Sequence, residues 1–481
     1  MSARPKQLHV NLFEMACVSH IVHGMWRMPG NNRHRMGEMA YWLEVAKLSE
    51  EGLFDAVFLA DVIGTYDRFG AGDAPALREG VQIPNLDPLM LVTAMAAVTR
   101  HVGFGVTFST TYEPPFAFAR RMATLDLLTG GRVGWNVVTS YLRSAAQNFG
   151  LDDEIPHDRR YAIADEYMDV LYKLWEGSWD DTAVRNDAAA GIYTNPDAVR
   201  RINHTGTHFR VAGPHLVQPG RQRTPVVFQA TGSPAGLEFA ARHAEVVFIG
   251  GQTTADVRAN IARTRERARA HGRHGDDIRF IVMAGIVTDT TDALARKKLE
   301  KYQQYYSTEG ALVHAQAEID LRRYDPNERI GDVLRREGVT FGNMNRRFRP
   351  DQTIGSALRQ IATFDEGRFF AVGSPTTVAT QIEGWLDIDG VDGINLRQYH
   401  SFDTARDFID LIIPELQRRG RYRTAYTPGE SLRERLFERP GQARLPERHF
   451  AARYRDPAAL HAPAAPLFPD EPAPSPLSKA S

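Results

Sequence analysis

The chain has 481 residues, of which 43% are hydrophobic, and its formal net charge is −1. This size supplies a core for one large α/β barrel with insertions or for two domains. The neutral balance leaves no basic excess for nucleic acid or for an anionic membrane. The single cysteine, Cys17, excludes an internal disulfide and is typical of a reducing compartment. Because no apolar run reaches about 18 residues, we expect a soluble, cytoplasmic protein.

Short apolar runs alternate with helical patterns along the chain. The runs that predict strands are Leu8–Phe13, Ala56–Ala60, Gly103–Thr107, Arg132–Val138, Val226–Ala230, Val246–Ile249, Ile278–Val287 and Gly393–Leu396. The patterns that predict helices are Met39–Glu50, Asp87–Val98, Phe116–Leu128, His157–Trp179, Ala235–His243, Asp256–Ala270, Thr376–Trp385 and Thr404–Gln417. A hairpin is expected at about Asn203–Val211. Eight strands that alternate with helices predict a parallel (β/α)8 TIM barrel rather than an open sheet.

Two segments break this alternation. Residues 307–368 are polar, rich in arginine and mostly helical in pattern. We interpret them as an insertion in a single barrel domain that spans residues 1–427. From about Pro428 to residue 481 the composition shifts to Arg, Pro and Ala. This shift predicts a tail that is extended or disordered, or that packs on a neighbour.

The helix predicted from His157 begins in a way that suits an anion. His157 and Tyr161 are four residues apart, so they share one face of the first turn. The unpaired N–H groups and the positive end of the helix dipole favour a phosphate. The alternative is that the two side chains only cap and pack a scaffold helix.

Polar side chains also fall at the ends of predicted strands, where barrels of this kind bind their ligands. Asp61 closes the second strand, Thr107 and Ser109 end the third, and Asn136 lies late in the fourth. An ordinary cap of a loop or helix is the alternative for Asp61. Their joint placement at strand ends favours a functional role.

The turn after the fifth strand, Thr231-Gly232-Ser233, resembles a turn that cradles a phosphate. An ordinary N-cap is the alternative for Ser233. The first loop carries two imidazoles, His20 and His23, directly after the first strand. They lack a third ligand at metal-binding spacing and H-E-x-x-H is absent, so no metal is expected.

Other catalytic motifs are missing from the chain. G-x-S-x-G and a Walker A sequence are absent, which disfavours a hydrolase or an NTPase. No G-x-G-x-x-G follows the first strand, which disfavours a dinucleotide-binding domain. The remaining candidates are the polar residues at the strand ends and in the first loop.

Several segments together resemble one family. They are NLFEMACVSH, FDAVFLADV, TRHVGFGVTFSTTYEPPFAFARRMATLDLLTGGRVGWNVVTSY, HDRRYAIADEYMDVLYKLWEGSW and HTGTHFRVAGP. The chain resembles the nitrilotriacetate, dibenzothiophene sulfone and dimethylsulfide monooxygenase group of the bacterial-luciferase-like flavin-dependent monooxygenases, over roughly residues 8–419. MACVSH and DVIGTYD are most similar to the dimethylsulfide branch.

The resemblance implies a luciferase-like (β/α)8 barrel that uses reduced FMN (FMNH2) as cosubstrate and O2, through a C4a-peroxyflavin. It implies a separate NAD(P)H:FMN reductase as partner and a homo-oligomer, either a dimer or a tetramer. Asp61 and Thr107 would line the isoalloxazine, and Asn136 completes the predicted cofactor-binding set at the strand ends. Cofactors of this kind perform the oxygen chemistry, while the protein supplies binding, orientation and a dry pocket.

The resemblance also implies roles on the phosphate side and in the first loop. His157 and Tyr161 would reach the flavin and its phosphate. Ser233 would hold the phosphate, although the family usually shows Gly-Ser-Ser or Gly-Ala-Ser where this chain has Thr-Gly-Ser. His20 is the candidate catalytic residue, because imidazole titrates near neutral pH, and Phe13 and Phe58 would be apolar walls.

We therefore expect the oxygenase component of a two-component monooxygenase that oxidises a small organosulfur compound such as a dimethylsulfide-like thioether. One alternative is a C–N-cleaving aminopolycarboxylate monooxygenase, which would need arginines such as Arg27, Arg397 or those of the insertion. A deazaflavin-dependent oxidoreductase, a non-catalytic flavin-binding protein of the same fold and a barrel of unrelated chemistry are the others.

Overall fold

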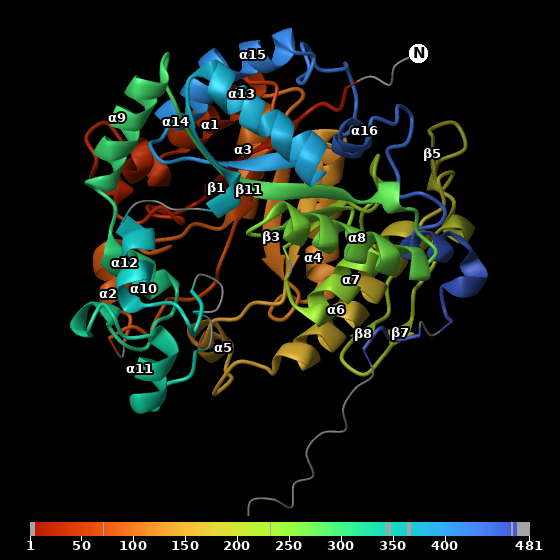
Figure 1. Ribbon diagram of the computed structural model, residues 1–481. Helices are drawn as coiled ribbons and strands as arrows, with labels where there is room; N and C mark the ends of the chain where they lie inside the picture. The colour runs from red at the N-terminus through yellow and green to blue at the C-terminus, as the bar shows by residue number, and fades with distance from the viewer. Residues whose placement is uncertain are drawn as a thin grey trace, which may run out of the picture.

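Eight parallel strands close into a barrel at the centre of the molecule (Figure 1). They are β1 (His9–Met15), β2 (Ala56–Ala60), β3 (Gly103–Ser109), β4 (Val133–Val138), β9 (Val226–Ala230), β10 (Val246–Ile249), β11 (Arg279–Thr288) and β13 (Gly393–Arg397). The pairings β1–β13 and β10–β11 complete the ring. The computed structural model describes residues 5–70, 72–230, 232–341, 344, 348–362, 367–462 and 465–468. The predicted (β/α)8 barrel is confirmed, with the eight strands where the apolar runs predict them.

Helices surround the barrel and connect its strands. They are α1 (Met39–Glu51), α2 (Ala74–Glu79), α3 (Pro88–Ala97), α4 (Pro115–Thr129), α5 (Arg143–Asn148), α6 (His157–Tyr172), α7 (Pro234–His243), α8 (Thr254–Ala270), α9 (Asp292–Gln303), α13 (Pro375–Gly384), α14 (Asp403–Asp407) and α15 (Ile413–Arg418). Local sequence fixes their ends. Proline occupies the first turn of α4, and Gly130 ends that helix in the left-handed conformation. Thr253 and Asp256 form a capping box at the start of α8.

Interior side chains of the barrel lie in layers of four that come from alternate strands. Followed around the barrel, the strand registers form one layer from Phe58, Asn136, Phe248 and Asn395. The next layer toward the carboxyl ends of the strands consists of Phe13, Thr107, Ala230 and Met283. This upper layer forms the mouth of the barrel, where ligands bind in such folds.

Glycines make room for the aromatic rings inside the barrel. A Cβ at Gly134 would lie 2.4 Å from Phe228 Cε2, and one at Gly105 would lie 2.9 Å from Phe58 Cδ2. Phe58 also packs edge-on against Phe228 and Phe248, with ring centroids 5.6 and 4.8 Å apart. The interior beneath the mouth is therefore filled, and the barrel is a core with a floor rather than a pore.

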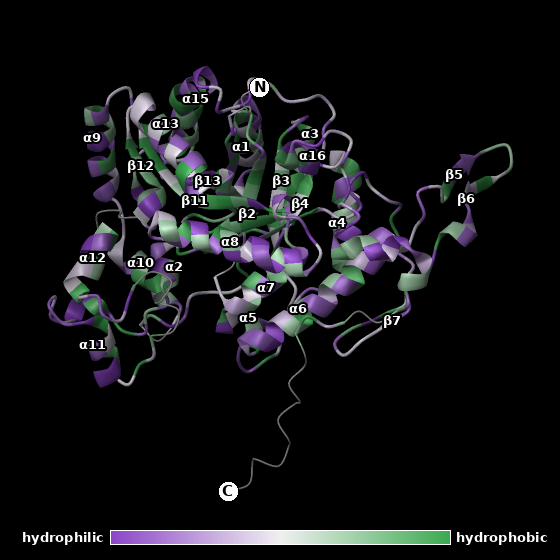
Figure 2. Ribbon diagram, turned by 45° about the vertical axis from the view of Figure 1, so that its right-hand side comes forward, coloured by the Kyte–Doolittle hydropathy of each residue, from purple (hydrophilic) through white to green (hydrophobic). Residues whose placement is uncertain are grey.

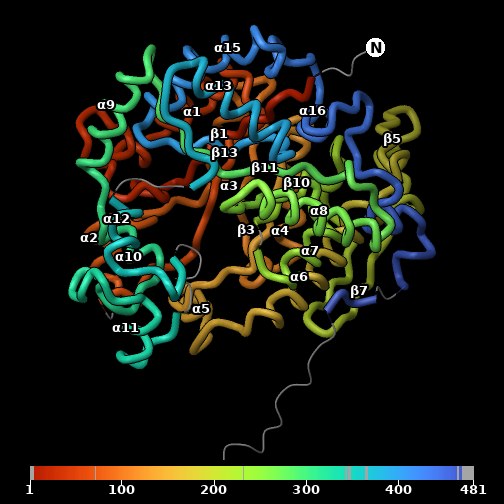
Figure 3. Tube along the Cα trace, in the orientation of Figure 1, coloured from red at the N-terminus to blue at the C-terminus, as the bar shows by residue number. Residues whose placement is uncertain are grey.

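Helix α16 (Leu432–Phe437) closes the amino-terminal end of the barrel. Leu432 and Leu436 are fully buried and belong to the same apolar cluster as Phe58 and Phe228. A Cβ at Gly103, the first residue of β3, would lie 2.8 Å from Leu432 Cδ1. Figure 3 traces the C-terminal part of the chain back to the barrel at α16. The prediction of an extended or disordered tail from residue 428 is wrong for residues 428–462; residues 469–481 lie outside the described residues.

The insertion forms a small helical unit with its own apolar core. It contains α10 (Thr308–His314), α11 (Ile330–Arg336) and α12 (Ile354–Ala362). Leu312, Val333 and Ile354 pack together with Tyr66 and Leu142, which lie in the loops after β2 and β4. Because those loops leave the carboxyl ends of the strands, the insertion covers part of the mouth. It is followed by β12 (Phe370–Gly373), a ninth strand that pairs with the later half of β11 and that we did not predict.

Two hairpins lie outside the barrel. The predicted one is confirmed as β7 (His204–Thr205) and β8 (Arg210–Val211). The other, β5 (Val184–Asp187) with β6 (Ile192–Thr194), was not predicted and extends away from the body (Figure 2). Within the described ranges, none of the helices has the length and apolar character that a membrane crossing requires.

Candidate active site

The mouth of the barrel is buried on one side and open on the other. Thr107 is 2% and Asn136 is 5% exposed, whereas Met283 on β11 is 40% exposed. Asn136 Nδ2 donates to Thr107 Oγ1 at 3.0 Å, which fixes both side chains. Asn136 Oδ1 is buried and has no hydrogen-bond partner among the described residues. A buried acceptor without a partner costs about 1–3 kcal/mol, so a ligand N–H at this position would be stabilising.

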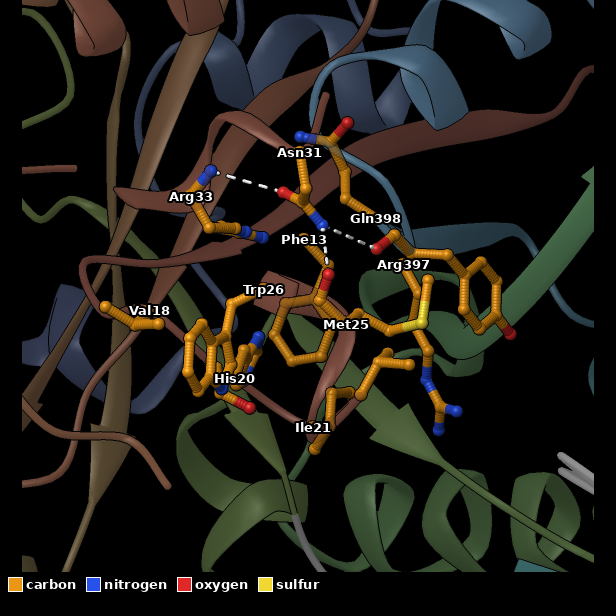
Figure 4. A pocket seen from close by; sticks show the side chains of 13 residues that line it. Phe13, Val18, His20, Ile21, Met25, Trp26, Asn31, Arg33, Arg397 and Gln398 are labelled. Atoms are coloured by element: carbon orange, nitrogen blue, oxygen red, sulfur yellow. Dashed lines mark hydrogen bonds between the residues drawn. The ribbon is translucent and has the colours of Figure 1, made fainter. Parts of the chain in front are cut away.

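His20 lies in the loop after β1, against the mouth. Its imidazole packs edge-on against Phe13 with centroids 4.5 Å apart, and Phe13 lies 5.7 Å from Phe58. Figure 4 shows His20 in a pocket with Trp26, and Arg397 reaches the same pocket from the end of β13. The pocket therefore joins the first loop to the last strand of the barrel.

Burial lowers the pKa of His20 well below 6.5, and the nearby Arg33 guanidinium lowers it further. The imidazole is therefore neutral around pH 7, and the expectation that it titrates near neutral pH is wrong. Its physical reason is desolvation, which disfavours the charged form. A neutral imidazole still offers one N–H donor and one nitrogen acceptor to a reacting group.

A hydrogen-bonded network holds His20 from behind. Gln82 Nε2 donates to the backbone oxygen of His20 at 2.8 Å, and Tyr66 OH donates to Gln82 Oε1 at 2.9 Å. Gln82 Nε2 also lies 3.3 Å from Nε2 of His314 on α10, and Tyr66 OH lies 2.8 Å from Tyr141 OH. Sequence reasoning missed these four residues, because they come from four separate segments with no shared spacing. The one local signal is the positive φ of 53° at Gln82.

Asp61 lies directly after β2 at the rim of the mouth. Asn85 Nδ2 donates to its Oδ1 at 2.6 Å. Burial raises the pKa of Asp61 to about 7, and the charge of Asp87 adds to the rise. Asp61 rather than His20 is therefore the group at the mouth whose charge changes near neutral pH.

Replacing Asp61 with asparagine is expected to stabilise the protein at pH 8 and much less at pH 5. The folded-state carboxyl loses its proton as the pH rises through about 7, whereas the unfolded one ionises near 4. The folded state holds the additional proton between these values, so wild-type stability falls as the pH rises across them. Urea unfolding at both pH values should show the gap between the two proteins growing by on the order of 2 kcal/mol. A gap that is independent of pH would contradict the raised pKa.

The predicted phosphate side is built from the starts of α6 and α7. His157 is half exposed, pairs with Asp158 at 2.7 Å and packs 5.1 Å from the ring of Tyr161. Tyr161 is buried and contacts Phe239 of α7, with ring centroids 5.7 Å apart. Ser233 caps α7, because its Oγ accepts from Gly236 N at 3.0 Å. Thr231, the first residue of the predicted phosphate turn, lies outside the described residues.

The structure brings the predicted residues together in three groups. His20 lines the first-loop pocket, and it is the one of the seven predicted residues that does. Thr107 and Asn136 form a hydrogen-bonded pair in the barrel mouth. His157 and Tyr161 pack on the helix that Ser233 caps, while Asp61 stands at the rim with Asn85.

Residues 21–392 match the family model described as luciferase-like monooxygenase. The chain belongs to this family. The long-chain alkane monooxygenase of Geobacillus thermodenitrificans is 47% identical over 94% of this chain and 98% of its own length. The dimethyl-sulfide monooxygenase of Hyphomicrobium sulfonivorans is 42% identical over 94% of each chain. The nitrilotriacetate monooxygenase component A of Aminobacter aminovorans is 35% identical over 89% of this chain and 96% of that protein.

Solved structures agree with this assignment. The long-chain alkane monooxygenase LadA superposes with a TM-score of 0.86, covering 94% of this chain and all of that one. A riboflavin lyase, RcaE, solved with modified FMN and riboflavin, is 34% identical, covers 94% of this chain and all of its own, and has a TM-score of 0.85. The family predicted from the sequence motifs is confirmed, and this luciferase-like protein is a flavin-dependent oxygenase. The alkane relative is more similar than the dimethyl-sulfide relative, so the comparisons do not confirm the predicted organosulfur substrate.

Proposed function

We propose that this luciferase-like monooxygenase is the oxygenase component of a two-component system. It would take FMNH2 from a separate NAD(P)H:FMN reductase and oxidise a small, uncharged, mainly apolar compound with O2. The substrate would be a thioether, as predicted from the sequence motifs, or a hydrocarbon, as the name of the alkane relative suggests. The observation that carries this proposal is the apolar, neutral setting of His20 at the mouth, described above.

The pairing of the arginines disfavours an aminopolycarboxylate substrate. Arg27 donates to the backbone oxygens of Gly24 and Tyr305, and Arg33 pairs with the buried Glu14. In the insertion, Arg322 pairs with Asp320 and Glu309, Arg335 with Asp332, and Arg336 with Glu328. A substrate with several carboxylates needs several cations that are not already neutralised in this way. Arg397 reaches the pocket, but its neighbours there include the apolar Met25 and Trp26.

The residues of the mouth fit a reduced flavin. Asn136 Oδ1 would accept a hydrogen bond from an N–H of the isoalloxazine, which would satisfy a buried acceptor. Phe13, Phe58 and Phe248 supply an apolar floor beneath it. The starts of α6 and α7, with Tyr161 and Ser233, would bind the phosphate through backbone N–H groups and a hydroxyl.

The bound flavin supplies the activation of O2. In this proposal the protein excludes water with its phenylalanine floor and orients the substrate beside His20. The neutral imidazole holds a proton on one nitrogen and accepts one on the other. Gln82 fixes the backbone of His20, so the ring keeps one orientation toward the mouth.

Turnover with chemically reduced FMN tests the proposal. Enzyme, FMNH2 and O2 are combined without nicotinamide, together with dimethyl sulfide, a long-chain alkane or nitrilotriacetate. We expect an oxygenated product from at least one of the two uncharged compounds and none from nitrilotriacetate. A strict requirement of the purified enzyme for NADH would contradict the two-component proposal, and product from nitrilotriacetate alone would contradict the substrate class. Substrate oxidation by a deazaflavin without O2 would favour the hydride-transfer alternative.

Substituting Ser233 separates its capping role from phosphate binding. Ser233→Asn and Ser233→Asp both keep an N-cap acceptor for α7, so both variants should remain as stable as the wild type. The aspartate should weaken FMN binding by about tenfold, because two like charges about 4 Å apart repel by about 1 kcal/mol in water and by more near a protein. Riboflavin, which lacks the phosphate, should bind both variants alike. Equal losses for FMN and riboflavin would remove Ser233 from the phosphate site.

A further inference from the structure

The mouth of the barrel contains an exposed thioether. Met283 lies on the inward face of β11, since Ile281 two residues earlier belongs to the cluster inside the barrel. It shares the uppermost filled layer with Phe13 and Thr107, and it is 40% exposed. It therefore stands over the floor on which the proposed flavin would rest, on the open side of the mouth.

The other methionines of the described chain differ from Met283 in place or in exposure. Met39 at the start of α1 is 52% exposed and Met90 on α3 is 61% exposed, but both lie on helices outside the barrel. The remaining described methionines are 7% exposed or less. Met39 and Met90 are therefore internal controls: they equal or exceed Met283 in exposure to solvent but do not face the mouth.

The single cysteine of the chain does not compete for oxidants. Cys17 is fully buried just after β1, and burial raises the pKa of its thiol to about 12. A thiol reacts with peroxide as the thiolate, so this side chain is protected both by its charge state and by its burial. The sulfur atom that peroxide formed at the mouth would meet is that of Met283.

We propose that Met283 is a site of oxidative self-inactivation, converted to methionine sulfoxide by hydrogen peroxide released at the mouth. This inference rests on the proposed function. When no substrate is present, reduced flavin passes two electrons and two protons to O2 and leaves as oxidised flavin and H2O2. The peroxide O–O bond then breaks, one oxygen bonds to the Met283 sulfur, and the other leaves as water. Sulfur is oxidised by two electrons and peroxide is reduced by two.

The modification would change the mouth in a definite way. A sulfoxide is polar, so it would introduce a strong acceptor beside Phe13 in an otherwise apolar layer. Water would follow it, and bound reduced flavin would lose part of its dry setting. Because methionine sulfoxide reductases reverse the change, activity lost by this route is recoverable. Substrate protects, since coupled turnover uses the oxygen that would otherwise leave as peroxide.

Peptide mass spectrometry on the full-length enzyme tests the inference. Enzyme is cycled with FMNH2 and O2 without substrate, and sulfoxide at Met283, Met39 and Met90 is measured together with residual activity. We expect several-fold more sulfoxide at Met283 than at the two outer methionines, a parallel loss of activity, and recovery after treatment with methionine sulfoxide reductases. Met283→Leu should retain its own initial activity through more cycles, whereas Met39→Leu and Met90→Leu should fail at the wild-type rate. Equal oxidation of the three sites, or oxidation of Met283 without loss of activity, would overturn the inference.

A second arm separates this inference from the proposed function. Hydrogen peroxide is added to enzyme without flavin, and FMNH2 affinity is measured before and after. Oxidation of Met283 should weaken FMNH2 binding in the wild type and not in Met283→Leu. If the enzyme fails to bind FMNH2 at all, the proposed function has failed. If it binds FMNH2 and the affinity is unchanged by Met283 oxidation, the inference about Met283 is wrong.

Discussion

Replacing His20 with alanine is expected to lower product formation by about 100-fold, the lower end of what a positioned proton-transfer group contributes. Flavin oxidation should continue, with the missing product recovered as hydrogen peroxide. The physical reason is that His20 packs on Phe13 at the mouth as a neutral imidazole, with its backbone fixed by Gln82. It can therefore act on oxygen or substrate without holding the flavin. The measurement is product and peroxide per FMNH2 consumed.

A matched histidine serves as control. His271 at the end of α8 pairs with Glu238 outside the barrel, so His271→Ala should leave coupling unchanged. The pH dependence adds a second check. Because the pKa of His20 lies well below 6.5, any change in coupling centred near pH 7 should belong to Asp61 and disappear in Asp61→Asn. Coupled turnover that survives in His20→Ala would remove this residue from the reaction.

The parts of the site that the sequence predicts are those that follow from one strand and its end. Asp61, Thr107 and Asn136 come directly from the rule that barrels bind ligands at the carboxyl ends of their strands. The rule works because alternation along a strand decides which side chain points inward. Ser233 was found for a related reason, since a small polar residue before a helix is either a cap or a ligand-binding group, and the structure shows the cap.

The residues that were missed depend on contacts between distant segments. Gln82, Tyr66 and His314 form a network only after the insertion folds over the loops that follow β2 and β4. Met283 was missed for another reason. Its strand reads as a continuous apolar run, and only the closed barrel shows that this one side chain reaches the open mouth.

The C-terminal segment shows how composition can mislead. Arginine and proline dominate the sequence after residue 428, and that composition is typical of an extended tail. In the folded chain the arginines of α16 are buried instead. Arg435 donates to the backbone oxygens of Asp55 and His101, and Arg433 pairs with Glu245. A segment rich in charge can thus form part of a core where each charge finds a partner.

Replacing Arg433 with alanine is expected to lower the free energy of unfolding by about 3–5 kcal/mol, the cost of leaving a buried charge without its partner. Arg433 and Glu245 are each 3% exposed and make two hydrogen bonds of 2.6 and 2.9 Å. Glu245 also accepts from Val227 N in β9, so its carboxylate ties α16 to the amino-terminal end of the barrel.

The surface pair Arg335–Asp332, with side chains 78% and 59% exposed, is the control. Arg335→Ala should change stability by less than about 1 kcal/mol. The midpoint of urea unfolding measures both variants. Combining Arg433→Met with Glu245→Leu should recover much of the loss, because it removes the buried charge together with its partner. If Arg433→Ala unfolds at the same urea concentration as Arg335→Ala, α16 does not close the barrel, and the C-terminal segment is the tail that its composition suggests.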